Sequence, residues 1–342
     1  MTLSNSSQRV QIAGSELSFS CQSGDTILRA ALREGLAFPY ECNVGSCGNC
    51  KFELLEGEVN TSWSEAPGLS EKDKLKNKWL GCQTHAVGDL QIKLRTADKY
   101  KPVHTPLKTE AWLRSSRAIT HDLSEFRFEL AEPMAFSSGQ YALLQMSGIQ
   151  GPRAYSMSTQ GGSAKFVDFQ VRRTPDGVGS SALFNLPLGE RVEIDGPYGM
   201  AYLREDAPRD ILCIAGGSGL APMVSVARGA LNSLKLQKQR LHFVYGARTT
   251  RDVCGLDMLE ALDDWSARGH YQAVISGATT DAPLQANQLQ GFAHDAVNEI
   301  WGDRLAEMEI YFAGPPLMAQ SLIKVLVDRK VPMDQVHFDQ FY

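Results

Sequence analysis

The stretch YECNVGSCGNCKFELLEGEVN, residues 40–60, places three cysteines within nine positions. Cys42, Cys47 and Cys50 follow the spacing C-x4-C-x2-C among small residues, and Cys82 is the next cysteine in the chain. The N-terminal residues lack the apolar region of a secretion signal, so we expect no disulfide framework. Clustered cysteines in a reducing compartment indicate metal or redox chemistry.

A triplet with this spacing and one distant fourth cysteine is typical of plant-type [2Fe–2S] ligation. The loop between the cysteines contains Gly45 and Gly48, which permit sharp turns and allow backbone N–H groups to approach sulfur. We therefore predict that Cys42, Cys47, Cys50 and Cys82 bind the cluster. Structural zinc is the alternative, but zinc sites usually pair two short C-x2-4-C motifs, and here there is one triplet.

The residues around the triplet predict a small α+β domain. Residues 25–35 read as a helix that Asp25 caps and Gly35 ends, and residues 88–96 alternate like a strand. Together with the cysteine motif, these features resemble the plant-type ferredoxin domain, which is a β-grasp fold. The resemblance covers residues 1–98.

Composition and charge exclude other classes of protein. The 342 residues carry a formal net charge of −5, which disfavours a nucleic-acid binder because such proteins usually have a basic surface. No apolar run approaches the roughly 20 residues of a membrane span. We expect a cytoplasmic protein with three domains.

The middle of the chain is rich in short alternating segments. Residues 99–106 form a polar linker with Pro102 and Pro106, and residues 107–206 predict several strands of a barrel or sandwich. Within this region lie GPRAYSMS (151–158) and FQVRRTPDGVGSSALF, which ends at Phe184. These two motifs, following a ferredoxin domain, resemble the antiparallel β-barrel FAD domain of the ferredoxin–NADP reductase superfamily.

That resemblance implies a role for each motif. Arg153 would pair with the FAD pyrophosphate, Tyr155 would pack on the isoalloxazine ring, and Ser156 would hydrogen-bond near flavin N5. Arg172 would support the adenylate side, and the turn from Gly177 would offer N–H groups to the pyrophosphate. The FAD-binding residues implied are Arg153, Tyr155, Ser156, Arg172, Gly177, Val178, Ser180 and, at the C-terminus, Phe341.

Residues 207–342 predict strands that alternate with helices, and therefore a parallel sheet. An apolar strand runs into the glycine-rich segment 216–219 and then into a helix, an arrangement that binds phosphate. Together with YGAR (245–248) and AGPPLM (313–318), this segment resembles the nicotinamide-binding α/β domain of the same superfamily. The NAD-binding residues implied are Gly216, Gly217, Ser218, Gly219, Tyr245, Arg248, Gly314, Pro315, Pro316 and Met318.

Two details of this region affect the expected chemistry. Ala313 stands where many relatives have cysteine, so we expect activity without a thiol contribution. Phe341 is expected to cover the flavin ring opposite the tyrosine, and it forms a catalytic set with Tyr155 and Ser156. Because Asp252 adds negative charge beside Arg248 and Arg251, we expect NADH rather than NADPH.

As a whole the chain resembles the reductase component of bacterial multicomponent oxygenases, closest to the toluene and xylene type. The resemblance implies electron transfer from NADH through FAD and [2Fe–2S] to a terminal oxygenase or an intermediate Rieske ferredoxin. We expect a monomer, and we expect Glu53, Glu56 and Glu58 to be either a docking patch or a solvated edge. The alternatives are a reductase for a deoxysugar dehydratase and a redox sensor without turnover.

Overall fold

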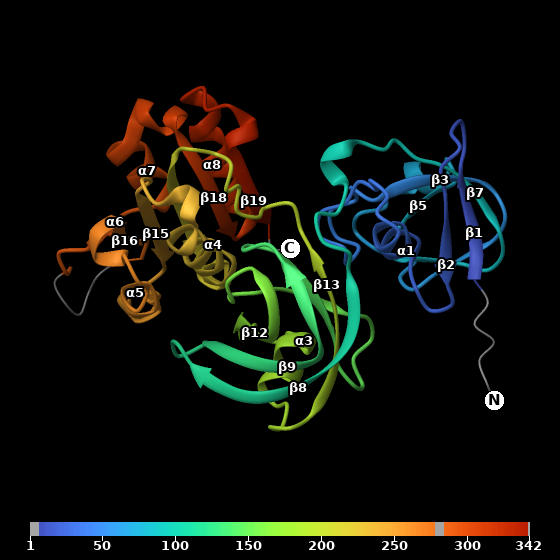
Figure 1. The fold of residues 1–342 in the computed structure, drawn as a ribbon, viewed down its shortest axis with the longest axis horizontal. Helices are drawn as coiled ribbons and strands as arrows, with labels where there is room; N and C mark the ends of the chain where they lie inside the picture. Colours follow the sequence, from blue (N-terminus) through green and yellow to red (C-terminus); the bar gives the residue numbers. More distant parts are fainter. Residues whose placement is uncertain (1–6, 278–283, 341–342) are drawn as a thin grey trace. The chain divides into compact units, whose positions relative to one another are not determined.

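The computed structural model describes residues 7–277 and 284–340 (Figure 1). The chain divides into two compact units. The first comprises residues 1–108 with two short segments, 150–154 and 195–198, and the second comprises the remaining residues.

The first unit is built on a five-stranded sheet with the order β2-β1-β7-β3-β5, beside a two-stranded sheet of β4 and β6. β1 pairs antiparallel with β2 and parallel with β7, and one helix, α1, buries five of its seven residues. This arrangement is the expected β-grasp fold. Its elements are β1 (Ser7–Ile12), β2 (Ser18–Gln22), α1 (Ile27–Arg33), β3 (Lys51–Glu56), β4 (Val59–Thr61), α2 (Glu71–Lys74), β5 (Lys78–Leu80), β6 (Thr84–Ala86), β7 (Leu90–Lys93) and the 3-10 turn η1 (Asp98–Tyr100).

The start of α1 differs from the sequence-based prediction. Thr26, not Asp25, is the N-cap, and its hydroxyl accepts a hydrogen bond from the Arg29 N–H. Asp25 forms an ion pair with Arg33 at 3.0 Å instead, so the carboxylate serves a side-chain contact and leaves the cap to its neighbour. Gly35, with φ of 77°, follows the end of the helix as expected.

An antiparallel barrel follows, and most of its residues belong to the second unit. Its six strands run in the order β11-β10-β13-β8-β9-β12, and an isolated bridge from Met157 to Phe169 joins the two ends of this sheet. The inward residues of the long strands form one apolar core, which includes Phe126, Phe128 and Phe169. The elements are β8 (Leu107–Ala118), β9 (Leu123–Phe136), β10 (Tyr141–Gln145), β11 (Arg153–Ser156), β12 (Gly162–Arg172), α3 (Val178–Phe184) and β13 (Arg191–Tyr198).

The C-terminal part is an entirely parallel sheet with the order β17-β16-β15-β14-β18-β19. Its strands are β14 (Asp210–Gly216), β15 (Leu241–Ala247), β16 (Gly269–Ile275), β17 (Gln288–Gln290), β18 (Met308–Gly314) and β19 (Val336–Gln340). Its helices are α4 (Leu220–Asn232), α5 (Leu256–Glu260), α6 (Trp265–Arg268), α7 (Ala293–Trp301) and α8 (Pro316–Asp328), with 3-10 turns η2 (Gly217–Gly219), η3 (Leu234–Leu236), η4 (Thr250–Asp252), η5 (Gly302–Glu307) and η6 (Met333–Gln335).

Helices cover both faces of this sheet because alternate strand residues point to opposite sides. On β14, Ile211 and Cys213 belong to the core that contains α4, α5 and α6, whereas Leu212 and Ile214 belong to the core that contains α7 and α8 (Figure 1). β14 lies centrally, and its carboxyl end adjoins those of β15 and β18. The segments predicted to bind nicotinamide therefore meet at one edge of the sheet, where parallel α/β sheets bind ligands.

Candidate functional site

The four predicted ligand cysteines lie in two pairs in the first unit. Cys42 and Cys47 form one pair, in which the Cys47 N–H donates to the Cys42 sulfur at 3.3 Å and the Cys42 N–H donates to the Cys47 sulfur at 3.5 Å. Cys50 and Cys82 form the other pair and are 2% and 1% exposed. The Gln83 amide donates to the Cys82 sulfur at 3.7 Å. The backbone therefore aims N–H groups at sulfur, as the loop sequence predicts.

Each pair favours one thiolate. The hydrogen bond from the Cys47 thiol lowers the pKa of Cys42 to about 5, and the same bond raises the pKa of Cys47. A hydrogen bond from Cys50 likewise lowers the pKa of Cys82, while the pKa of Cys50 rises. The lowered pKa values favour the thiolate form of Cys42 and Cys82, and thiolate is the form that ligates iron.

The spacing of the sulfurs fits a two-iron cluster better than a single metal ion. A tetrahedral zinc site with Zn–S bonds of about 2.3 Å brings all four sulfurs within about 3.8 Å of one another. In the described part of the chain, the group whose ligand atoms all lie within 4.8 Å is His121, Asp122 and Asp252, and it includes none of these cysteines. The donors fit [2Fe–2S], which four-cysteine sites hold with two protein sulfurs on each iron.

Glycines bring the cluster loop against the segment APGLS (66–70). Gly48 has φ of 76°, and a Cβ atom added to it would lie 2.5 Å from the Gly68 carbonyl oxygen. A Cβ atom added to Gly68 would lie 2.6 Å from the Gly48 nitrogen and 2.8 Å from the Gly45 carbonyl oxygen. The Gly68 N–H donates to that carbonyl at 2.9 Å. The loop keeps its conformation because two backbone segments touch where no side chain fits.

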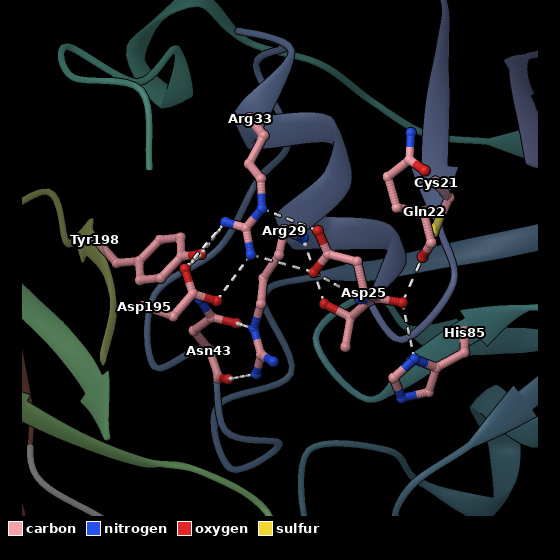
Figure 2. Close-up of polar contacts among 10 residues, drawn as sticks. Cys21, Gln22, Asp25, Arg29, Arg33, Asn43, His85, Asp195 and Tyr198 are labelled. Carbon is pink, nitrogen blue, oxygen red and sulfur yellow. Dashed lines mark hydrogen bonds and ion pairs between the residues drawn. The ribbon is translucent and has the colours of Figure 1, made fainter. Parts of the chain in front are cut away.

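Two arginines of α1 make polar side-chain contacts in the first unit (Figure 2). Arg29 donates to the side-chain and backbone oxygens of Asn43, a cluster-loop residue with φ of 56° that is 1% exposed. Arg33 lies between Asp25 and Asp195, with N–O distances of 3.0 and 2.9 Å. The Tyr198 hydroxyl completes this group by donating to Asp195 at 2.8 Å.

Burial sets the charge balance of this group. Desolvation raises the pKa of Asp25, while the charge of Arg33 lowers it and that of Asp195 raises it. Desolvation and the Asp195 charge raise the pKa of Tyr198, so its hydroxyl stays a donor. Arg33 is therefore the cation that compensates two carboxylates with side chains 14% and 9% exposed.

Strand β11 carries the R-x-Y-S motif predicted to bind FAD. In the first unit, the Arg153 guanidinium donates to the carbonyls of Gln150, Gly151 and Pro152 at 3.0 to 3.2 Å. In the second unit, half-buried Tyr155 packs on the barrel core and Ser156 is 8% exposed. The carbonyl groups of the three preceding residues thus orient the Arg153 guanidinium.

The second predicted FAD segment is the turn that begins α3. Asp176 has φ of 58°, and Gly177 is the N-cap. The Ser180 hydroxyl accepts from the Thr174 N–H at 3.1 Å and donates to the Gly177 carbonyl at 3.2 Å. The side chain of Ser180 therefore fixes the turn. The first N–H groups of a helix have no intrahelical acceptor, so this turn fits a pyrophosphate through its backbone.

The glycine-rich loop joins β14 to α4 at the carboxyl edge of the sheet. Gly217 has φ of 58°, and Gly217 and Ser218 are half-buried, so their backbone is accessible. A Cβ atom at Gly219 would collide with the Ala313 carbonyl oxygen. Tyr245 is fully buried, and its hydroxyl donates to the Gly217 carbonyl at 3.3 Å. Tyr245 thus stabilises the conformation of the loop through this hydrogen bond. The accessible backbone of the loop fits a dinucleotide phosphate.

Met318 lies at the point where the three strand ends meet. A Cβ atom added to Gly216 would lie 2.7 Å from its sulfur, and one added to Gly314 would lie 2.6 Å from its methyl carbon. Pro315 is the N-cap of α8 and Pro316 its first residue, a favoured position for proline. The structure therefore brings the segments 216–219 and 314–318 together, as predicted.

Arg172 ends β12 beside the glycine-rich loop. A Cβ atom at Gly217 would lie 3.0 Å from its guanidinium, which also faces Asp122 at 3.1 Å and Asp252 at 3.7 Å. Asp252 is 7% exposed and accepts hydrogen bonds from the Thr249 N–H and hydroxyl. Its carboxylate is thus occupied by Arg172 and Thr249, whereas Arg248 is exposed.

Phe341 lies outside the described residues. The strand that leads to it, β19, pairs parallel with β18, and Phe338 stacks on Phe312 with ring centroids 4.9 Å apart. Phe338 is partly buried and packs against the core that contains α7 and α8.

The sequence-based prediction did not find several supporting residues. Gly68 lies 18 positions after Cys50, and the pattern APGLS carries no cysteine or charge to connect it with the loop. Asn43 and Arg29 are polar residues whose contact depends on the folded position of α1. A long-range covariation with the cysteine loop is the signal that would have identified them.

Comparison with known families assigns a model to each region. The 2Fe-2S iron-sulfur cluster binding domain matches residues 10–87, the oxidoreductase FAD-binding domain residues 110–202, and the oxidoreductase NAD-binding domain residues 213–324.

Individual relatives match over nearly the full length. The chain is 38% identical to the ferredoxin–NAD(P)(+) reductase CarAd of Metapseudomonas resinovorans, over 94% of this chain and 96% of the relative. It is 34% identical to the xylene/toluene monooxygenase electron transfer component XylA of Pseudomonas putida, over 97% and 93%. The solved ferredoxin reductase in carbazole 1,9a-dioxygenase superposes with a TM-score of 0.88 at 36% identity, over 98% and 99% of the two chains.

The chain belongs to the ferredoxin–NAD(P)+ reductase components of multicomponent oxygenase systems. It is an oxidoreductase that uses a nicotinamide nucleotide, FAD and [2Fe–2S] to supply electrons to an oxygenase component. The fold class predicted from the sequence is confirmed in all three regions. None of the helices in the described ranges combines the length and apolar character that a bilayer-spanning helix needs.

Substitution of Arg33 by methionine tests the charge group in the first unit. Loss of the cation leaves two buried carboxylates uncompensated, so we expect the free energy of unfolding to fall by roughly 3 kcal/mol at pH 7. The loss of cluster absorbance in urea measures it. Lys93→Met, which breaks an exposed pair with Glu53, is the control and is expected to cost less than about 1 kcal/mol.

The effect of Arg33→Met is expected to depend on pH. The folded-state pKa of Asp25 is raised above its ordinary value of about 3.9, and it rises further without Arg33. The protonated carboxyl therefore stabilises the fold below that ordinary value, and this contribution is lost as pH rises through the raised pKa. We expect the loss of unfolding free energy in Arg33→Met, relative to the wild type, to be smaller at pH 4 than at pH 7. An equal loss at both pH values would contradict this account.

Gly68→Ala tests the contact between the cluster loop and residues 66–70. The added methyl group meets backbone atoms of Gly48 and Gly45, so we expect a cost of about 2 kcal/mol and incomplete cluster loading. Iron and sulfide per chain measure the loading. Gly88→Ala is the matched control because a Cβ atom there meets nothing within 4 Å. Equal iron content in the two variants would show that the contact is unnecessary.

Proposed function

We propose that this reductase takes electrons from NADH and delivers them to an oxygenase that acts on an aromatic or unsaturated hydrocarbon. The observation that carries the proposal is the near full-length likeness to CarAd and XylA. A third relative, the alkene monooxygenase ferredoxin–NAD(+) reductase component of Xanthobacter autotrophicus, is 36% identical over 95% of this chain and 98% of the relative. Because two of these relatives are named as components of monooxygenase systems, an oxygenase partner is favoured over a deoxysugar dehydratase, and turnover is favoured over a sensor.

The proposed cofactor contacts follow the geometry of each segment. Arg153 is assigned to the FAD pyrophosphate, Tyr155 to the isoalloxazine ring, and Ser156 to the region of N5, with Phe341 on the opposite face. The turn 177–180 offers backbone N–H groups to the same pyrophosphate. When bound, FAD accepts two electrons together and releases them singly, which joins a two-electron donor to a one-electron cluster.

Arg172 receives a different assignment from the one its sequence position suggested. Its guanidinium lies against Gly217, in the loop proposed to bind the nicotinamide dinucleotide. We assign it to the NAD side of the site, where its positive charge favours a phosphate and Asp122 and Asp252 orient it. Met318, Gly314 and Pro315 are assigned to the nicotinamide end of the same proposed site.

NADH is the proposed reductant, but the argument for it differs from the one that the sequence suggested. The buried Asp252 carboxylate pairs with Arg172 and accepts hydrogen bonds from Thr249, so Arg172 compensates part of the negative charge on which the expectation of NADH was based. The support for NADH is now the name of the alkene monooxygenase relative, which specifies NAD(+). Exposed Arg248 is assigned to the adenosine ribose.

The remaining parts of the proposal concern organisation and partner. We propose domain boundaries at residues 1–98, 107–206 and 207–342, with a linker at 99–106, and a cytoplasmic monomer. The partner is a terminal oxygenase component or a Rieske ferredoxin that stands between the two. Its docking patch is proposed to include Glu53, Glu56 and Glu58 on and after β3, where the last two are exposed.

Arg153→Ala and a comparison of the two nucleotides test the cofactor assignments. We expect this variant to lose most of its FAD, because the charge-assisted contact with the pyrophosphate is removed. The control is Arg114→Ala, which breaks an ion pair between Arg114 on β8 and Glu129 on β9, and this variant should keep its FAD.

For the wild type we expect kcat/KM at least about ten-fold higher with NADH than with NADPH. Full FAD content in Arg153→Ala, or a preference for NADPH, would refute the corresponding assignment.

Charge reversal at the three glutamates tests the docking patch. With lysine at positions 53, 56 and 58, we expect slower reduction of the partner and a weaker dependence of the rate on ionic strength. Reduction of a small artificial acceptor should be unchanged, since it needs no docking. An unaltered partner rate with unaltered salt dependence would mean that these residues form only a solvated edge.

A further inference from the structure

A polar stripe on α4 packs against the barrel of the same unit. Ser225, Arg228, Gly229 and Asn232 have the spacing i, i+3, i+4 and i+7, which places them on one face of the helix. We call this set the α4 stripe. Its partners are the turn 137–139 and the residues 158–160, both in the barrel.

Ser225 has the most buried position in the stripe. It is fully buried, its hydroxyl donates to the Thr159 carbonyl at 2.6 Å, and it accepts from the Gly139 N–H at 3.0 Å. One side chain therefore satisfies a backbone acceptor and a backbone donor that come from two different barrel segments. Because hydrogen bonds are directional, the contact fixes the orientation of α4, which a purely apolar contact does less strictly.

The rest of the stripe extends this contact along the helix. Arg228 donates to the Ser158 carbonyl at 2.7 Å, and Asn232 donates to the Gln160 side chain at 2.6 Å. A Cβ atom at Gly229 would lie 2.5 Å from the Ser138 hydroxyl, so glycine permits the close approach. Glu125 and Asp168 provide negative charge near the Arg228 guanidinium, which is otherwise largely removed from water.

The two ends of this contact coincide with the two proposed binding segments. Residues 158 and 159 follow the R-x-Y-S motif, which ends at Ser156, with only Met157 between them. α4 begins directly after the glycine-rich loop 216–219. Ser225 is six residues beyond Gly219, or about 9 Å along the helix axis. A continuous path of backbone and hydrogen bonds thus connects the flavin motif with the nicotinamide loop.

We propose that Ser225 and Arg228 are positioning residues that set the placement of the nicotinamide-binding loop relative to the flavin motif. They act through the backbone of residues 158–159, and the proposal rests on the assignment of the motif at 153–156 to FAD. Electron transfer from nicotinamide to flavin requires close placement of the reacting atoms, and a displacement of about 1 Å costs up to about a hundred-fold in rate. The stripe is therefore expected to affect the rate of flavin reduction more than the binding of either cofactor.

Ser225→Ala and Ser233→Ala form the matched pair of variants. Ser233 is also buried and follows the same helix, but its hydroxyl donates to Glu205 at 2.8 Å and not to the barrel. We expect Ser225→Ala to keep its FAD and to bind NAD+ within about three-fold of the wild type, while its rate of flavin reduction by NADH falls about ten-fold or more. Ser225→Thr retains a hydroxyl and should recover most of the rate.

Hydrogen–deuterium exchange provides a readout that does not depend on turnover. The Gly139 N–H donates to Ser225, so its exchange should accelerate in Ser225→Ala and not in Ser233→Ala. If Ser225→Ala does not accumulate, Arg228→Met takes its place, with slower flavin reduction as the expected result and faster exchange measured over residues 158–161.

Two results would overturn the proposal. One is flavin reduction in Ser225→Ala as fast as in Ser233→Ala, and the other is loss of FAD, which would make Ser225 a binding determinant. Failure of the wild type itself to be reduced by NADH would count instead against the proposed function, so the two failures are distinguishable.

Discussion

Both functional regions depend on close approach between backbone segments, which only glycine permits. In the first unit, Gly48 and Gly68 let the cluster loop touch residues 66–70, and backbone N–H groups then face the sulfurs of Cys42 and Cys47. In the second unit, Gly219 lies against the carbonyl of Ala313, which brings the ends of β14 and β18 together. Side chains at these positions would separate the segments, and neither the cluster nor the dinucleotide would have its backbone donors.

Buried polar side chains fix the arrangement of the elements that the glycines bring close together. Arg33 compensates Asp25 and Asp195, Tyr245 supports the glycine-rich loop, and Ser225 joins α4 to the barrel. A buried charge or hydroxyl is costly without a partner, so each contact favours a single arrangement of the elements that it joins. Such specificity suits a reductase, because its chemistry depends on the distances between cofactors.

The local motifs made most of the fold predictable, together with the segments that are proposed to bind the cofactors. Spacing alone indicated the cysteine ligands, and strand–glycine–helix patterns indicated the parallel sheet with Gly216–Gly219 at its carboxyl edge. The errors came from contacts between residues distant in the sequence. Asp25 pairs with Arg33, and Thr26 caps the helix in its place, whereas Asp252 pairs with Arg172 and Thr249, partners that the sequence pattern did not indicate. Sequence patterns do not record which of several available partners a charged side chain meets after folding.

The central claim is that electrons from NADH reach a [2Fe–2S] cluster held by Cys42, Cys47, Cys50 and Cys82. The most direct measurement is an anaerobic NADH titration of the purified protein, followed by visible absorption and by electron paramagnetic resonance, with iron and sulfide assays on the same sample. We predict that the flavin and cluster bands bleach together and that the signal of a reduced [2Fe–2S] cluster appears. A colourless protein that contains zinc, or a cluster that dithionite reduces but NADH does not, would contradict the claim.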